Sequence, residues 1–423
     1  MTMDRRSFLS RSGALALLAA AGFTGMEGFS PDEIAAAAEL VRATPALPAG
    51  TPILVMIDLQ GGNDATNMFI NPNDFWYYDV AQGHGAVAVA EKDLLALGST
   101  GYALNPAMPW TAARYGSHND VAFVRGPGEN VVNDFSHFAS MHYRQVASFN
   151  PAVSTGWLGR LNDLVATNNP FASISTAGVH PSLVGATTPV LSVPDIQNFN
   201  FNVGWQWQDG FLPAWQAMSG PGWPIGSPTR AAELSLKDTF EAQSQVYASW
   251  NPTLSATFAS SWVAQQLSNA AMLINANIPC RTYMVTTGGF DTHGSETAAE
   301  AALFSDLDTA LGEFFAAIAT SSRANDVFVY MSSEFGRQQT VNGSGGCDHG
   351  QAGTDVLIGP KVKGGLYGQT PDSSPSARLD DALVPTVDFR SVYATILNHM
   401  NNKDVSVSHE VLFGTYENIP CFL

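Results

Sequence analysis

Three glycine-rich turns between residues 288 and 350 contain side chains of the kinds that bind metal ions. The first turn contains Asp291 and His293, the second contains Glu334, and the third contains His349. In extended backbone, residues i and i+2 point the same way, so Asp291 and His293 can face one ion. Carboxylate and imidazole ligands suit zinc, manganese or iron. The residue types and their spacing therefore predict a site for a divalent transition metal.

Apolar runs that are typical of buried strands flank these turns. Residues 283–286 precede Asp291, residues 327–331 precede Glu334, and residues 354–359 follow His349. Because open α/β sheets bind ligands at the carboxyl ends of their strands, the pattern predicts an α/β fold with the site at those ends. Each residue has an ordinary alternative: a turn cap, a surface carboxylate or a hydrogen-bonded loop imidazole. Their coincidence at strand boundaries favours the metal site.

A further buried strand is predicted at residues 52–57, from its continuous apolar run. As the first strand of the domain it is expected to lie centrally in the sheet. Asp58 and Asp64 follow it, on either side of Gly61 and Gly62, and both are candidates for the same site. Either carboxylate could instead hold the glycine turn by hydrogen bonds.

Ser136 stands at the expected N-cap of a helix that continues through Gln145. A helix N-terminus also favours an oxyanion, so the position suits a nucleophile beside a metal. A third possibility is a serine acyl hydrolase in which His137 or His142 assists Ser136. No Gly-x-Ser-x-Gly sequence surrounds this serine.

The composition limits the partners of the chain. Of its 423 residues, 45% are hydrophobic and 13% charged, and the formal net charge is −18. This balance supports a sizeable core and argues against nucleic acid or an anionic membrane surface as a partner, since both require a basic face.

The N-terminus has the pattern of an export signal. Arg5 and Arg6 precede a short apolar run at residues 13–22, which is too short to span a bilayer. We expect residues 1–44 to be a twin-arginine signal peptide and linker, with cleavage between residues 35 and 43. The mature protein is then expected to be periplasmic or extracellular, without a membrane span. This pathway carries folded proteins, commonly with a cofactor, which fits a metalloprotein.

The three cysteines, Cys280, Cys347 and Cys421, are an odd number, so at least one is expected to be unpaired. Cys347 lies near the predicted site, but it has no Cys-x-x-Cys neighbour and is not expected to bind the metal.

The chain is expected to form one α/β domain from residues 50–194 and 256–423. Residues 195–255 are rich in Trp, Asn and Gln and interrupt this domain. They are predicted to form either a cap over the site or a surface subdomain. Helices are predicted at residues 301–319 and 388–398, and further strands at residues 121–124, 174–178 and 189–193.

Several motifs together resemble one family over roughly residues 54–416. They are Gly61-Gly-Asn-Asp64, Ser136-His-Phe138, Gly156-Trp-Leu-Gly-Arg160, Gly289-Phe-Asp-Thr-His-Gly294, Ser333-Glu-Phe-Gly-Arg337 and Gly343-Ser-Gly-Gly-Cys-Asp-His-Gly350. The chain resembles the twin-arginine-exported family catalogued as domain of unknown function 1501. That family is grouped with the alkaline phosphatase and sulfatase superfamily. The resemblance implies a doubly wound α/β sandwich with a mostly parallel sheet, and a hydrolase site with one or two metal ions.

The resemblance also implies roles for individual residues. Asp291, His293 and His349 resemble the ligands of one metal, and Asp58 or Asp64 with Glu334 resembles those of a second. Ser136 resembles the nucleophile of the superfamily. Two features depart from the superfamily: Phe335 stands where an imidazole ligand is usual, and the sulfatase Cys-x-Pro-x-Arg sequence is absent.

Two functions are compatible with these features. The first is an exported metal-dependent hydrolase of phosphate or sulfate esters, acting on a small molecule or a polymer. Arg337 or Arg160 would hold the anionic group through a planar fork of N–H donors. The second is a non-catalytic binding or assembly protein that keeps the fold, a structural metal and an exported protein partner; Phe335 and the insert motivate it.

Overall fold

A computed structural model describes residues 46–129, 135–166, 169–197, 199, 245, 246, 249, 254 and 256–423. The predicted signal peptide and almost all of the predicted cap lie outside these residues. Among the described residues, no helix combines the length and apolarity needed to cross a bilayer.

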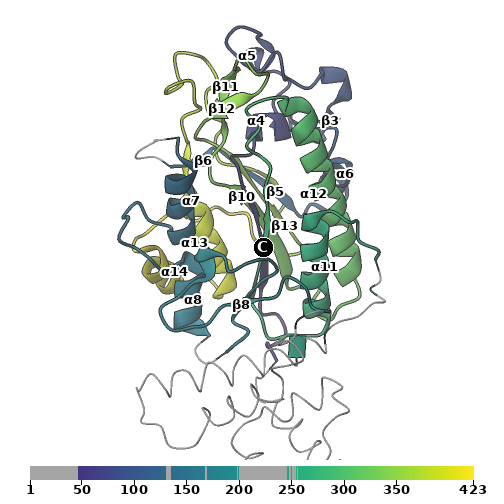
Figure 1. Cartoon of the computed structure of the whole chain (residues 1–423), viewed down its shortest axis with the longest axis vertical. Helices are drawn as coiled ribbons and strands as arrows, with labels where there is room; N and C mark the ends of the chain where they lie inside the picture. The colour runs from purple at the N-terminus through teal and green to yellow at the C-terminus, as the bar shows by residue number, and fades with distance from the viewer. Residues whose placement is uncertain are drawn as a thin grey trace, which may run out of the picture.

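A sheet of eight strands forms the centre of the fold (Figure 1). Neighbouring strands pair in parallel, except that β13 is antiparallel to both its neighbours. In spatial order the strands are β14 (Gly365–Tyr367), β5 (Val121–Arg125), β13 (Thr354–Ile358), β10 (Val327–Ser333), β1 (Ile53–Leu59), β9 (Thr282–Thr287), β7 (Ser173–Ser175) and β8 (Leu191–Ser192). The predicted mostly parallel α/β sheet is thus confirmed, with the first strand near its middle.

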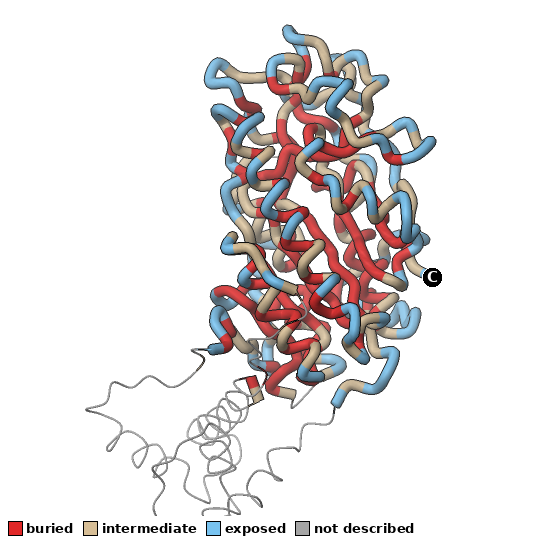
Figure 2. Tube along the Cα trace, turned by 90° about the vertical axis from the view of Figure 1, so that its right-hand side faces the viewer, coloured by how far each residue is buried: buried red, intermediate tan, exposed pale blue. Residues whose placement is uncertain are grey.

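Helices cover both faces of this sheet, as a doubly wound sandwich requires (Figure 1). One face carries α6 (Pro109–His118), α11 (Trp262–Asn275) and α12 (Glu296–Ile318), and the other carries α7 (His137–Val146), α8 (Trp157–Val165), α13 (Phe389–Met400) and α14 (Val405–Leu412). The central strands are therefore buried on both sides, as Figure 2 shows.

The apolar run of β1 is continuous because its two faces meet two different cores. Ile53, Val55 and Ile57 pack with α11 and α12, whereas Leu54 and Met56 pack with α8 and α13. Side chains alternate along a strand, so Asp58 points to the same side as Leu54 and Met56. This alternation decides where the Asp58 carboxylate goes.

Short elements form the end of the molecule beyond the carboxyl ends of β1, β9 and β10, at the top of Figure 1. They are α4 (Ala65–Met68), β2 (Phe69–Ile70), α5 (Phe75–Tyr78), η1 (Glu91–Asp93), β3 (Leu95–Ala96), β4 (Ala103–Leu104), β6 (Pro127–Gly128), β11 (Arg337–Val341), β12 (Cys347–His349) and β15 (Val387–Asp388); η2 (Pro181–Leu183) connects β7 to β8. The run at 174–178 and the run at 189–193 are thus parallel neighbours joined through η2, and the pair is not a hairpin.

Candidate metal centre

The loop after β9 places Asp291 and His293 beyond the carboxyl end of the sheet. Gly61, in the turn after β1, lies directly against this loop: a Cβ added at Gly61 would be 2.4 Å from the Asp291 backbone nitrogen. Gly61 also has φ +120°, which L side chains rarely adopt. The glycine turn after the central strand therefore allows the neighbouring loop to approach closely and fixes the height of Asp291.

Three imidazoles surround the Asp291 carboxylate. Its Oδ1 atom is 3.0 Å from Nε2 of His293, 3.2 Å from Nε2 of His349 and 3.4 Å from Nε2 of His137. The Nε2 atoms of His293 and His349 are 2.8 Å apart. The structure thus brings together the predicted residues Asp291, His293 and His349 and adds His137 from the first turn of α7.

Each of these imidazoles is held through its other ring nitrogen. His349 Nδ1 is 2.6 Å from the Phe135 carbonyl oxygen, which only accepts, so Nδ1 carries the proton. His293 Nδ1 is 2.7 Å from an Asp348 oxygen, and His137 Nδ1 is 2.8 Å from a Glu334 oxygen. In the neutral rings, all three Nε2 atoms then present lone pairs to the same point.

A contact from Arg337 supports this assignment for His293. The guanidinium Nη1 lies 3.4 Å from His293 Nε2. Because a guanidinium only donates hydrogen bonds, the Nε2 atom must accept. Metal-binding histidines usually show this arrangement, with the second ring N–H donated to a carboxylate or carbonyl.

The site favours an ionised Asp291. Partial burial acts to raise its pKa, but the hydrogen bond and positive charge of Arg337 prevail and lower the pKa of Asp291 to about 2. The hydrogen bond to Glu334 raises the pKa of His137 above its ordinary value. Without a metal ion, Asp291 and the neighbouring imidazoles would therefore share a proton. A bound metal ion would replace that proton.

Four separations among these atoms are close to those between the ligands of a tetrahedral metal site, and His137, Asp291 and His349 each offer a ligand atom within 4.8 Å of the other two. Metal–nitrogen and metal–oxygen bonds of about 2.0–2.2 Å place tetrahedral ligands about 3.3–3.6 Å apart. The observed separations of 2.8–3.4 Å are close to this, without an ion between the ligands. The donor set of three imidazole nitrogens and one carboxylate oxygen suits Zn²⁺ and related divalent ions.

Glu334 contacts a candidate ligand, His137, and is not itself among the four converging groups. Its Oε1 atom accepts from His137 Nδ1 and, at 2.9 Å, from the Gly61 backbone N–H. Phe335 packs its ring at 4.9 Å, centroid to centroid, from both His137 and His349. Phe335, where the sequence resemblance led us to expect an imidazole ligand, therefore packs beside two histidines as an aromatic side chain.

Arg337 is buried, and its N–H groups are already engaged. Nε donates to the Gly62 carbonyl at 2.7 Å, Nη1 to the Cys347 carbonyl at 3.0 Å, and Nη2 to the Phe290 carbonyl and Asp291 Oδ1, both at 2.8 Å. The residue thus joins the loops around the site and offers no free fork to a substrate. Arg160 is likewise engaged, with donations to the carbonyls of Val146 and Val411.

Asp58 lies on the other side of Glu334. Its carboxylate contacts His180 Nε2 at 3.1 Å and accepts from Gln60 at 3.0 Å. Asp58 and Glu334 line the same small cavity, of about 10 Å³, together with Arg144 and His180. The Arg144 guanidinium in this cavity opposes a cation there, so the structure does not present Asp58 and Glu334 as a ligand pair.

Asp64 is fully buried and lies in a separate group of side chains. It caps α4 by accepting from the Thr66 backbone N–H at 2.9 Å, and its other oxygen is 3.0 Å from His84 Nε2. Among the described residues, no hydrogen bond or ion pair joins Asp64 to Asp291 or Glu334.

Ser136 is the N-cap of α7, as predicted, and accepts from the Ala139 backbone N–H at 3.5 Å. It stands between Phe135, whose carbonyl holds His349, and His137. Phe135 has φ +53°, an unusual conformation for a side chain of this size. The serine is thus next to the candidate metal centre along the chain.

His137 is the ligand candidate that sequence reasoning did not include. Its signal is the Ser136-His137-Phe138 motif, in which the sequence suggests the imidazole only as a partner for the serine. No local spacing in the sequence links His137 to Asp291, which lies 154 residues further on.

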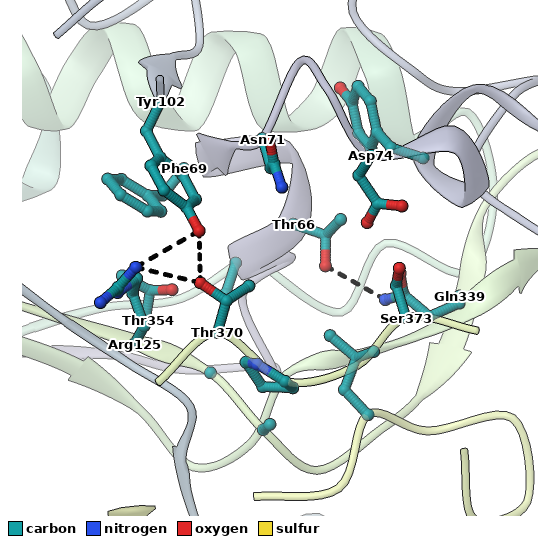
Figure 3. A pocket seen from close by; sticks show the side chains of 16 residues that line it. Thr66, Phe69, Asn71, Asp74, Tyr102, Arg125, Gln339, Thr354, Thr370 and Ser373 are labelled. Atoms are coloured by element: carbon teal, nitrogen blue, oxygen red, sulfur yellow. Dashed lines mark hydrogen bonds between the residues drawn. The ribbon is translucent and has the colours of Figure 1, made fainter. Parts of the chain in front are cut away.

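A second cavity, of about 50 Å³, lies near β11 and α4 (Figure 3). Arg125 projects into it and donates to Tyr102 at 3.3 Å and to Thr370 at 3.2 Å, so its guanidinium is already satisfied. None of the predicted site residues lines this cavity. Its size is enough for water and small for a substrate.

Residues 92–413 match the family model described as "Protein of unknown function (DUF1501)", so the chain belongs to the DUF1501 family. No curated protein matches the chain.

Among solved structures, the chain is similar to the lipoteichoic acid synthase LtaP from Listeria monocytogenes, with a TM-score of 0.35 and 8% identity over 78% of this chain and 71% of that one. It is also similar to Ps i-CgsB in complex with k-i-k-neocarrahexaose, with a TM-score of 0.36 and 12% identity over 86% and 75% of the two chains. TM-scores this low allow no inference about the site.

Proposed function

We propose that this protein is an exported, metal-dependent hydrolase of phosphate or sulfate esters, with one divalent transition metal held by His137, His293, His349 and Asp291. The single observation that supports the proposal best is the convergence of three Nε2 atoms on Asp291 Oδ1, each ring fixed through Nδ1. The twin-arginine pattern at Arg5 and Arg6 supports export.

The centre is open enough to meet a substrate. The side chains of Asp291 and His293 are 50% and 41% exposed, whereas those of His137 and His349 are 25% and 19% exposed. His137 and His349 are thus mostly covered by protein, whereas Asp291 and His293 are accessible from solvent. A bound divalent metal would act as a Lewis acid on an ester oxygen and lower the pKa of a hydroxyl group.

The protein's own residues perform the remaining tasks. Asp348, Glu334 and the Phe135 carbonyl orient the three rings, so that little rearrangement is needed when a ligand binds. Ser136, at the N-terminus of α7, is the proposed nucleophile: its oxygen attacks phosphorus or sulfur, the alcohol leaves with a proton, and water then releases the serine ester. The helix N-terminus favours the negative charge of the transferring group.

Metal content is the first test. We expect about one equivalent of metal at this centre in protein purified without chelator, and its loss in Asp291→Ala, His349→Ala and His137→Ala. His118→Ala, at an exposed histidine near the end of α6, is the matched control and should keep the metal. Retained stoichiometric metal in the three variants would refute the assignment.

Turnover is the second test. Aryl phosphate and aryl sulfate esters should be hydrolysed with added zinc or manganese, and Ser136→Ala should keep the metal and lose the activity. A Ser136→Ala variant as active as the wild type would exclude the serine as nucleophile.

A non-catalytic binding or assembly protein with a structural metal is the second candidate. The observation that favours it is that the N–H groups of Arg337 and Arg160 are committed to carbonyls and to Asp291, so neither is free to hold a substrate anion. Bound metal without turnover of either ester class would select this function.

A further inference from the structure

A second group of metal-binding side chains lies buried behind the exposed centre. It consists of His84, Glu296 and Cys347, together with Asp64 and Glu300, and each of these residues is at most 2% exposed. One ligand atom from each of His84, Glu296 and Cys347 lies within 4.8 Å of the other two, and the same holds for Asp64, Glu296 and Glu300. Glu296 belongs to both triads.

Rigid and separate elements supply these side chains. Glu296 and Glu300 are four residues apart, hence on one face of the first turns of α12. Asp64 caps α4, and Cys347 begins β12. A site assembled from several fixed elements needs little reorganisation to bind an ion.

The His84 ring is oriented as a metal ligand. Its Nδ1 atom is 2.8 Å from the Gln339 carbonyl oxygen and must donate to it, so in the neutral ring Nε2 has the lone pair. That Nε2 atom is 3.0 Å from Asp64 Oδ2 and 3.9 Å from Cys347 Sγ. With metal bonds of about 2.0–2.3 Å, tetrahedral N···O and N···S separations are about 3.3–3.6 Å, so both contacts are near the expected spacing.

One oxygen of the group has no partner. Glu300 Oε1 accepts from the Asp64 backbone N–H at 3.1 Å and from the Thr292 hydroxyl at 3.2 Å. Glu300 Oε2 is buried and has no hydrogen-bond partner. Buried carboxylate oxygens are normally satisfied, so an unpaired one beside other carboxylates indicates an absent donor or cation.

The negative charge of the buried carboxyl groups also favours a bound cation. Three buried carboxyl groups face one imidazole, and Arg337 nearby is committed to Asp291 and to backbone carbonyls. Two buried carboxylates beyond the one paired with His84 are too costly to remain ionised without compensation. Protons on these groups or a bound divalent ion would supply this compensation.

We propose that this protein has a second metal site, in which a divalent ion of the zinc class is bound by His84 Nε2, Asp64 Oδ2, the Glu296 carboxylate and Cys347 Sγ, with the Glu300 carboxylate beside it. A set of one imidazole, one thiolate and carboxylates suits Zn²⁺ better than Mg²⁺ or Ca²⁺, which prefer oxygen ligands alone. Full burial gives the site a structural role: it ties α4 and α12 to β12, two residues before His349.

Cobalt substitution tests this proposal, because Co²⁺ bound to a thiolate gives a sulfur-to-metal charge-transfer absorption that imidazole and carboxylate ligands do not give. The metal-free wild-type protein is titrated with Co²⁺ alone. We expect two equivalents to bind and the charge-transfer band to appear. Cys347→Ser should lose the band and one equivalent. Cys421→Ser, which removes another buried free thiol, is the matched control and should keep both.

The exposed centre is separated from the buried site by His293→Ala. This variant should lose one equivalent and keep the band, so failure of either site is recognised independently of the other. If Cys347→Ser does not fold, Glu296→Gln is the second variant, with an expected loss of at least about tenfold in the affinity that the band reports. Absence of the band in folded wild-type protein, or its persistence in Cys347→Ser, would overturn the proposal in favour of the protonated cluster.

Discussion

Replacing Glu334 by glutamine distinguishes a carboxylate that binds the metal from one that orients a ligand. Its Oε1 atom is 2.8 Å from His137 Nδ1, and its Oε2 atom accepts from the Ser333 hydroxyl at 2.9 Å. Glutamine preserves the shape and one acceptor oxygen but removes the charge. Losing a carboxylate behind a ligating imidazole weakens metal binding by about 10–100-fold, or about 1.4–2.7 kcal/mol.

The burial of Glu334 places the expected effect in the upper half of this range. The residue is 3% exposed, so solvent hardly screens its interaction with the His137 ring. Asp348→Asn makes the same change behind His293, across a hydrogen bond of 2.7 Å, but the Asp348 side chain is 52% exposed. We expect about 30–100-fold weaker binding for Glu334→Gln and about tenfold or less for Asp348→Asn.

The assay is a competition titration of Zn²⁺ against a chromophoric chelator, with the Cys347→Ser background used to remove the buried site. Asp306→Asn, at an exposed position of α12 outside the proposed ligands and their hydrogen-bond partners, removes the same charge and should leave the affinity unchanged. Complete loss of binding at saturating metal in Glu334→Gln would show that Glu334 is a ligand. Affinity equal to that of Asp306→Asn would show that it does not orient His137.

Three further predictions concern the framework. Gly61→Ala should displace Asp291 and lower metal occupancy, measured by elemental analysis, whereas Gly50→Ala has a similar positive φ, no atom within 4 Å, and should retain the metal. Arg337→Lys should lower the free energy of unfolding by about 2–4 kcal/mol in urea titrations, because buried carbonyls lose donors; an unchanged midpoint would contradict this. Burial lowers the pKa of His399 from 6.5 to about 4. Its stabilising contribution is therefore present above pH 6.5 and is lost as the pH falls towards 4, so His399→Leu should remove about 3 kcal/mol of acid destabilisation over that interval; parallel stability curves for the two proteins would refute it.

The sequence was sufficient for the strands and for part of the site. Continuous apolar runs such as that of β1 occur because helices cover both faces of the sheet, and this pattern is local and readable. Asp291 and His293 could be paired because they are two residues apart and just beyond a strand. The N-cap role of Ser136 could be read for the same reason, since a cap depends only on the residues that follow it.

Other assignments depended on which face of an element meets which neighbour. The alternation along β1 turns Asp58 towards His180, and the chain beyond Gly62 carries Asp64 into the buried group with His84. From the sequence, both carboxylates were equivalent candidates. The spacing contains no information on the direction in which each side chain points in the folded protein. Arg337 could not be recognised as engaged, since its acceptors are carbonyl oxygens at Gly62, Phe290 and Cys347.

By itself, then, the sequence determined the α/β sheet, its central strand and the local Asp291–His293 pair, because apolar runs, glycine turns and short spacings act over a few residues. Only the tertiary structure decided that His137 joins this pair, that Glu334 lies behind it and that Cys347 faces His84. These contacts join residues that are between 154 and 263 positions apart. Some of them also depend on which ring nitrogen of a histidine meets a carbonyl group. No local pattern encodes such contacts, because they are set by how the finished sheet and its helices pack.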